Sequence, residues 1–123
     1  GVRTIFKHLK LGGLTAILPD HVPKESGGIY SMFYGQNVLS STLVSKLAAK
    51  TQCAVIGLSC LRCDDLSGFQ IYVSKLSDDI LSKDLQLSVD TLNIELERMI
   101  NTAPAQYIWG YKRFRKIMEF KKD

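Results

Sequence analysis

The residues with the clearest chemical potential stand where apolar runs end. Asp20 and His21 are neighbours that follow the apolar run 14–18, and Arg62 follows a second apolar run. A carboxylate beside an imidazole can do acid–base chemistry or bind a polar ligand. The same residues can instead form an Asx-type turn and an exposed loop histidine. Because ligands of open α/β sheets gather at the carboxyl ends of strands, residues 19–28 and Arg62 are the first site candidates.

The cysteines favour neither a metal site nor a redox site. Cys60 and Cys63 have the C-x-x-C spacing, but a zinc site needs two further ligands at short spacing, and His8 and His21 lie far away in the sequence. A redox site would place its first cysteine at the start of a helix, whereas Cys60 ends an apolar run. We therefore expect buried or edge thiols in a reducing compartment, with no metal and no cofactor.

The composition is that of a globular domain with a basic C-terminal tail. The chain has 123 residues, 46% hydrophobic and 23% charged, with a net charge of +4, and we expect residues 1–123 to form a single domain. It has no apolar stretch near the ~20 residues that span a bilayer, no signal peptide and no motif that reads nucleic acid. The basic tail suits an anionic membrane surface or another anionic partner, or it is a solvated helix end. Its cations are Lys112, Arg113, Arg115, Lys116, Lys121 and Lys122.

The periodicity of apolar residues predicts helices that alternate with strands. We therefore expect an α/β fold with a mixed, mostly parallel sheet and helices on its faces. The runs 53–61 and 69–75 are expected to pair antiparallel across the turn 64–68. Because the chain begins inside a helix and without Met, we expect a piece of a longer protein. The other expected strands are 14–18 and 29–35, and the expected helices are 1–10, one capped by Ser40 or Ser41, and 85–103 before Pro104.

Five blocks in this order carry a resemblance to a known family. They are "LKLGGLTAILPDHVP", "GGIYSMFYGQ", the strand that ends in Arg62, "LNIELE" and "PAQYIWGYKRFR". Together they resemble the C-terminal half of the bacterial lipid A biosynthesis acyltransferases, which add lauroyl or myristoyl chains late in the pathway. The resemblance runs from Gly1 to about Arg115 and is most specific in the last block.

The resemblance implies transfer of a fatty acyl chain from acyl carrier protein to a hydroxyl of a lipid A precursor. It implies the cytoplasmic face of the bacterial inner membrane, and the C-terminal half of a fold like that of the glycerol-3-phosphate acyltransferases. The family's catalytic motif is H-x-x-x-x-D/E, but the fifth residue after His8 is Gly13 and the fifth after His21 is Ser26. We therefore expect the motif and a membrane anchor upstream of Gly1, and an inactive, soluble chain when these 123 residues stand alone.

The resemblance also assigns roles to individual residues. Asp20 is expected to orient loops or polar groups of the acceptor. Gly27 and Gly28, which lack a Cβ, would let the backbone approach a phosphate or sugar, or form an ordinary turn. Arg62 suits the phosphates of lipid A or the phosphopantetheine arm, or a salt bridge to a nearby aspartate.

The basic tail has two possible roles in this family. Aromatic side chains interleaved with cations could join the tail to the core while they offer charge to anionic lipid, or they could serve packing alone. The residues expected to face the membrane or an anionic partner are Lys112, Arg113, Arg115 and Lys116.

The alternative to the enzyme is a non-catalytic binding or interaction module made from the same half-fold. The two differ in what precedes Gly1 in the reading frame: the enzyme requires H-x-x-x-x-D/E and a hydrophobic anchor there. Binding of nucleic acid through the tail is not expected, because no recognition motif accompanies the charge.

Overall fold

The computed structural model describes residues 1–118. These residues contain three α-helices, four strands and three short 3-10 turns; one turn precedes β1, one precedes α3 and one follows α3. The helices are α1 (Val2–Lys10), α2 (Leu43–Thr51) and α3 (Leu85–Asn101); the strands are β1 (Gly28–Phe33), β2 (Gln36–Ser41), β3 (Ile56–Arg62) and β4 (Phe69–Lys75); the 3-10 turns are Glu25–Gly27, Asp78–Leu81 and Pro104–Gln106.

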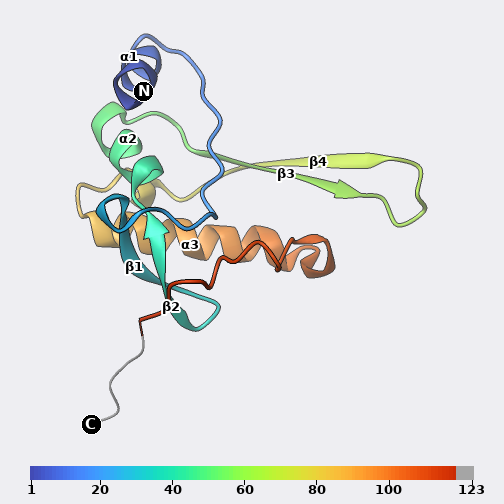
Figure 1. Cartoon of the computed structure of the whole chain (residues 1–123). Coiled ribbons are helices and arrows are strands. Elements are labelled where there is room, and N and C mark those ends of the chain that lie inside the picture. The colour runs from blue at the N-terminus through green and yellow to red at the C-terminus, as the bar shows by residue number, and fades with distance from the viewer. Residues whose placement is uncertain (119–123) are drawn as a thin grey trace.

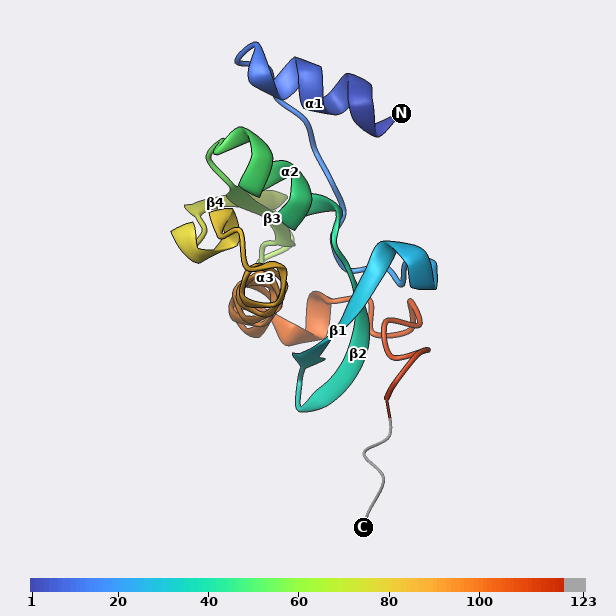
Figure 2. The ribbon, with the colours of Figure 1, turned by 90° about the vertical axis from the view of Figure 1, so that its left-hand side faces the viewer.

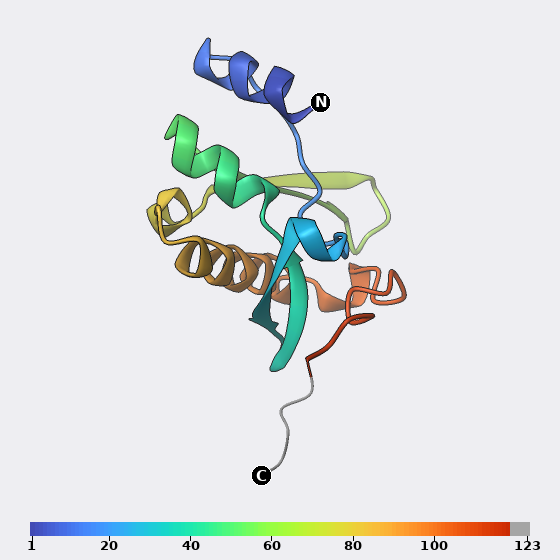
Figure 3. The same cartoon turned by 60° about the vertical axis from the view of Figure 1, so that its left-hand side comes forward.

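The helices are arranged in layers. In Figure 1, α1 lies above α2, and α2 lies above α3; the same order is seen in the turned views of Figures 2 and 3. The β1–β2 hairpin crosses α3 on one side, whereas the β3–β4 hairpin extends away from the helices (Figure 1). The chain after α3 returns alongside β2 (Figure 3).

The β1–β2 hairpin closes through the two-residue turn Tyr34-Gly35. Both residues have a positive φ, 48° at Tyr34 and 74° at Gly35, as a type I′ turn requires. This turn matches the right-handed twist of the strands and pairs Phe33 with Gln36 at the tip of the hairpin. The hairpin is therefore set locally, by two residues.

The strand β2 is not predicted by the sequence pattern. The pattern predicts one strand over 29–35 and a helix capped by Ser40 or Ser41, but the hairpin turn falls inside the predicted strand and the helix begins at Leu43. Tyr-Gly is not one of the dipeptides that favour a type I′ turn, and β2 has polar residues at both ends without a strict alternation. The signal for a second strand was therefore weak.

The expectation of a mostly parallel sheet is wrong. The described residues form two separate two-stranded sheets, β1–β2 and β3–β4, and both are antiparallel. Each pair is joined by a short turn, and only an antiparallel pair can be joined in that way. The helix α2 does connect two strands, but β3 pairs with β4 and not with β2, so no parallel crossover forms.

The other expected elements divide into confirmed and wrong. The helix at the N-terminus, the long helix before Pro104 and the antiparallel pair β3–β4 are confirmed. The strand expected over 14–18 is wrong, because these residues pair with no strand among the described residues, and Leu14 and Leu18 are 86% and 76% exposed. An apolar run becomes a buried strand only where partner strands are present.

The hydrophobic core lies between α2, α3 and the 3-10 turn Asp78–Leu81. The helix α3 is amphipathic and buries one face against these elements, while the side chain of its N-cap, Asp84, accepts a hydrogen bond from the Leu87 N–H at 3.2 Å. The innermost side chains are Ala48, Leu76, Ile80 and Leu92, surrounded by Val44, Val55, Leu81, Leu96 and Met99.

A polar stripe of α3 holds β1. The Ser31 hydroxyl donates to Asp90 at 2.6 Å, and the backbone N–H of Tyr34 donates to Glu97, also at 2.6 Å. The Gln86 amide donates to the carbonyl of Tyr30 at 2.9 Å. Because these helix residues are spaced by four and by seven positions, they share one side of α3, which meets β1 and the turn that follows it.

The tail is fixed to the core by a buried arginine. Arg113 is 1% exposed, and its guanidinium donates to the Leu39 carbonyl at 2.9 Å and to the Ser40 hydroxyl at 2.8 Å. It also lies 4.9 Å from the ring centroid of Phe33, a cation–π contact. Burial lowers the pKa of Arg113 from its ordinary value. The expectation that Arg113 faces a membrane is therefore corrected, because β1 and β2 enclose its side chain.

Replacing Arg113 tests this anchor. Arg113→Ala should lower the free energy of unfolding by more than about 2 kcal/mol, because it leaves a cavity and unpaired buried polar groups. The matched control is Arg115→Ala, since Arg115 is exposed, and its effect should stay within about 0.5 kcal/mol. Urea denaturation of the three proteins measures both; equal effects of the two substitutions would contradict the anchoring role.

Candidate functional site

The 3-10 turn Pro104–Gln106 and the residue after it connect the two strongest site candidates. Gln106 pairs with the backbone of Arg62: its side-chain carbonyl accepts from the Arg62 N–H at 2.8 Å, and its amide donates to the Arg62 carbonyl at 3.1 Å. The next residue, Tyr107, donates its hydroxyl proton to Oδ2 of Asp20 at 3.1 Å. Neighbouring residues of one segment therefore hold Arg62 and Asp20.

The Tyr107–Asp20 bond lies in a half-buried aromatic cluster. The Tyr107 ring is 4.8 Å from that of Trp109, edge to face, and Trp109 is 5.2 Å from Tyr34. Burial, followed by the charge of Asp20 and the hydrogen bond to it, raises the pKa of Tyr107 from 10 to about 12. Tyr107 therefore stays protonated and donates to Asp20 throughout the physiological range.

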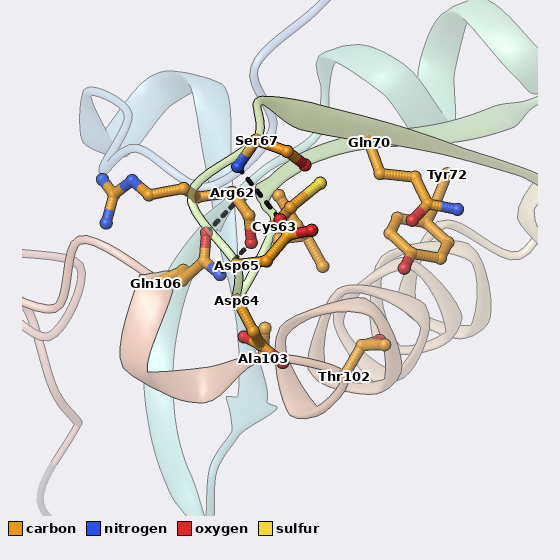
Figure 4. A pocket seen from close by; sticks show the side chains of 11 residues that line it. Arg62, Cys63, Asp64, Asp65, Ser67, Gln70, Tyr72, Thr102, Ala103 and Gln106 are labelled. Carbon is orange, nitrogen blue, oxygen red and sulfur yellow. Dashed lines mark hydrogen bonds between the residues drawn. The ribbon is translucent and has the colours of Figure 1, made fainter.

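Arg62 ends β3 beside a cavity of about 530 Å³ between the β3–β4 turn and the end of α3 (Figure 4). The cavity wall includes Asp64 and Asp65, so it is unsuited to a phosphate. Arg62 is one of the residues that line this cavity, and Figure 4 shows its side chain pointing away from Gln70 and Tyr72. Among residues 1–118, Arg62 forms no ion pair, and the expected alternative of a salt bridge to Asp64 or Asp65 is not found.

The two glycines differ in their surroundings. A Cβ on Gly28 would stand 2.6 Å from Cγ of Pro23 and 3.0 Å from both Leu39 Cγ and the Ser40 carbonyl oxygen. A Cβ on Gly27 would meet nothing closer than 3.9 Å. The close backbone approach at Gly28 is therefore made by the chain itself, whereas a Cβ on Gly27 would make only an ordinary van der Waals contact with Pro23.

The basic tail does not form one surface. Arg113 is buried, and Lys116 pairs with Glu25 at 3.2 Å. Lys112 and Arg115 are exposed and join no ion pair among the described residues. Lys121 and Lys122 lie outside the described residues.

The remaining candidates form no site of their own. His21 is exposed, and no hydrogen bond joins its side chain to Asp20. The cysteines are free thiols, with Cys60 exposed and the other two half-buried. Residues 1–118 contain no cluster of three metal-binding side chains, and none of their helices has the length and apolar character to cross a membrane.

Gln106 and Tyr107 are the functional candidates that sequence reasoning missed. They stand in the block "PAQYIWGY", which was read as a tail that packs or carries charge. The available signal was their position two and three residues after Pro104, where the chain must turn back from the end of a long helix. At such a turn the polar side chains of Gln106 and Tyr107 can form hydrogen bonds with neighbouring segments, here Arg62 and Asp20.

Comparisons with known proteins support the family resemblance that the sequence blocks carry. The family model described as bacterial lipid A biosynthesis acyltransferase matches residues 1–116. The chain is similar to the lipid A biosynthesis palmitoleoyltransferase of Escherichia coli (strain K12), with 24% identity over 115 residues, and equally to the lipid A biosynthesis acyltransferase of Shigella flexneri. The match covers 93% of this chain but only 37% of each relative.

Replacing each of the two glycines by alanine tests whether the surrounding atoms leave room for a Cβ. Gly28→Ala should lower the free energy of unfolding by about 1–3 kcal/mol, because Pro23 and a backbone carbonyl would have to move. Gly27→Ala is the matched control and should change it by less than about 0.5 kcal/mol. Thermal and urea unfolding give both values, and a harmless Gly28→Ala would contradict the packing role.

The Tyr107–Asp20 bond predicts a dependence of stability on alkaline pH. The pKa of Tyr107 is about 12 in the folded protein against 10 ordinarily, so its contribution is fully present below pH 10 and is lost as the pH rises to about 12. Tyr107→Phe removes the titrating group. Urea unfolding from pH 9 to 12 should show a smaller loss of stability in this variant; parallel curves would contradict the shifted pKa.

Proposed function

The chain belongs to the bacterial lipid A biosynthesis acyltransferase family, since the family model matches residues 1–116, and on that basis we propose that it is the C-terminal part of such an enzyme. The proposed reaction transfers a fatty acyl chain to a hydroxyl group of a lipid A precursor. The names of both curated relatives support an acceptor of the lipid A type. The proposed domain extends beyond these residues, because the match spans 37% of each relative.

In the proposed reaction, acyl carrier protein supplies the acyl chain as a thioester, at the cytoplasmic face of the inner membrane. A histidine held by a carboxylate removes the proton of the acceptor hydroxyl, whose oxygen attacks the thioester carbonyl; the carrier thiol leaves with a proton. The H-x-x-x-x-D/E pair for this step does not occur in these 123 residues. The proposal places it in the part of the enzyme outside them.

The observation that carries the proposal for this chain is the segment 104–107, which links Asp20 to Arg62. We assign Asp20 to the wall of the acceptor site, where its carboxylate accepts from Tyr107 and keeps further acceptor lone pairs for hydroxyl groups of the sugar. Arg62 extends an unpaired guanidinium from the end of β3, which suits a phosphate of the acceptor or of the carrier arm. We also assign Gly27 to this wall, because its backbone is less tightly enclosed than that of Gly28.

The structure narrows the proposed contact of the tail with anionic lipid. Arg113 is enclosed by β1 and β2, and Lys116 is paired with Glu25. Of the four residues first expected there, Lys112 and Arg115 remain exposed. Each such cation contributes about 1 kcal/mol near an anionic bilayer, so these two give a weak contact and not an anchor.

A non-catalytic module is the second candidate function. It is favoured by one observation, the absence of H-x-x-x-x-D/E from these residues. The two candidates differ in turnover, because the module would bind a lipid A precursor without acylating it.

The test uses the polypeptide encoded by the full reading frame that contains this sequence. With acyl carrier protein thioester and a lipid A precursor it should form the acylated product, and Asp20→Ala should lower kcat/KM at least about tenfold. Asp20→Asn keeps an acceptor oxygen for Tyr107, so it should lose activity with less effect on the melting temperature. The 123 residues alone should give no turnover.

The control for these substitutions is Asp79→Ala, since Asp79 is an exposed aspartate whose side chain takes part in no ion pair among residues 1–118. It should leave turnover unchanged. Wild-type turnover in Asp20→Ala would refute the site role of Asp20. Absence of turnover in the full polypeptide, with binding of the precursor retained, would favour the module.

A further inference from the structure

The β3–β4 hairpin is apolar on the face that points away from α3, here called the outer face. Alternate residues of a strand share one face, and this face of the hairpin carries three apolar residues from β3 and three from β4. Five of the six are 51–70% exposed, and Cys60 is exposed as well. The six apolar residues of the outer face are Ile56, Leu58, Cys60, Phe69, Ile71 and Val73; the register adds one cation at each end, Arg62 opposite Phe69 and Lys75 opposite Ile56.

The inner face of the same hairpin is polar. Ser59, Tyr72 and Ser74 line a space of about 230 Å³ against Glu95 and Arg98 of α3. The hairpin meets the core closely at its root, where a Cβ on Gly57 would stand 2.8 Å from both Leu76 and Met99. The usual pattern of an antiparallel pair, apolar toward the core and polar toward water, is therefore reversed.

A reversed pattern indicates that a second apolar layer covers the outer face. Monomeric proteins rarely leave a contiguous apolar patch of several large side chains in water, because each Å² of apolar surface removed from water contributes about 25 cal/mol. Unpaired strand edges beside such a patch would also promote aggregation. The β3–β4 hairpin therefore has the character of an internal strand pair.

We propose that the part of the acyltransferase outside these 123 residues packs against the outer face. This inference rests on the proposed function, and its occupant follows from length: the match spans 37% of each relative, so most of the family's chain has no place among the described residues. At Gly57 the inner face of the hairpin packs closely on Leu76 and Met99 of the core. A layer of chain on the outer face would therefore place the hairpin between that layer and the core.

The same packing gives Arg62 a defined position. Arg62 lies on the outer face, opposite Phe69, at the end of its apolar residues. Lys75 lies diagonally across the face and is already paired with Asp78 at 2.9 Å. The unpaired guanidinium of Arg62 therefore stands at the seam between the two parts of the enzyme, which places the proposed phosphate contact at that seam.

Thiol labelling of Cys60 tests the covering directly. In the 123-residue chain Cys60 is exposed and should react readily with a maleimide; in the polypeptide from the full reading frame it should react at least tenfold more slowly. Cys63 lies near the turn and is the internal control, with similar rates in both. Mass spectrometry assigns the label to each cysteine.

A paired substitution gives a second measurement. Leu58→Lys with Val73→Glu replaces two facing residues by opposite charges, so the hairpin itself keeps a compatible pair. The melting temperature should fall by more than 10 °C in the full polypeptide and by less than 2 °C in the 123-residue chain. Leu66→Lys, at the exposed turn, is the control and should change neither.

The outcomes separate this inference from the proposed function, because neither readout uses acyl transfer. Covering of Cys60 in an inactive polypeptide would support the packing and refute the function. Equal labelling of Cys60 in both proteins, or a reading frame with no further chain, would overturn the packing. So would a dimer of the 123-residue chain, seen by light scattering, that the paired substitution dissociates, because the occupant would then be a second copy.

Discussion

The arrangement of this chain depends on one buried cation. The Arg113 guanidinium packs against the β1–β2 hairpin and forms no ion pair among residues 1–118; it replaces water with the Leu39 carbonyl, the Ser40 hydroxyl and the ring of Phe33. Asn93 of α3 bonds the same hydroxyl at 2.9 Å, so strand, helix and tail meet at Ser40. A buried charge is expensive unless its donors are paired; the two terminal nitrogens of Arg113 are paired, whereas its Nε has no partner among the described residues. This cost makes the position of the tail specific.

That anchor also determines where the candidate site lies. Once Arg113 is fixed against β2, the segment before it must return from the end of α3 past Asp20 and Arg62, and Gln106 and Tyr107 meet them on the way. Gln106 replaces a neighbouring strand at the end of β3, since its amide makes both bonds that a backbone would make. Asp20 is thus held by a residue 87 positions away, which no local pattern in the sequence reveals.

Local features were predictable from the sequence, and partner choice was not. The amphipathic α3, its stop before Pro104 and the β3–β4 pair follow from spacing and turn residues within short windows. The apolar composition of the runs 14–18 and 53–61 predicted a strand in each, but only the second contains one, β3. Whether such a run pairs and is buried depends on chain that lies elsewhere. The basic tail shows the same limit: Arg113 and Arg115 look alike in sequence, and only the packing of β2 makes one of them interior.

The last described residues have a consequence for the order in which parts of the fold form. The Lys116 carbonyl accepts from the Leu39 N–H at 3.1 Å and the Met118 N–H donates to the Asn37 carbonyl at 2.9 Å, so this short piece meets β2 through one isolated antiparallel bridge, between Val38 and Ile117. The hairpin itself closes through two residues, whereas this contact joins Val38 to Ile117 across most of the chain. Because a long loop must close before such a contact can form, the hairpin is the faster of the two to form and the contact with the tail is the later one.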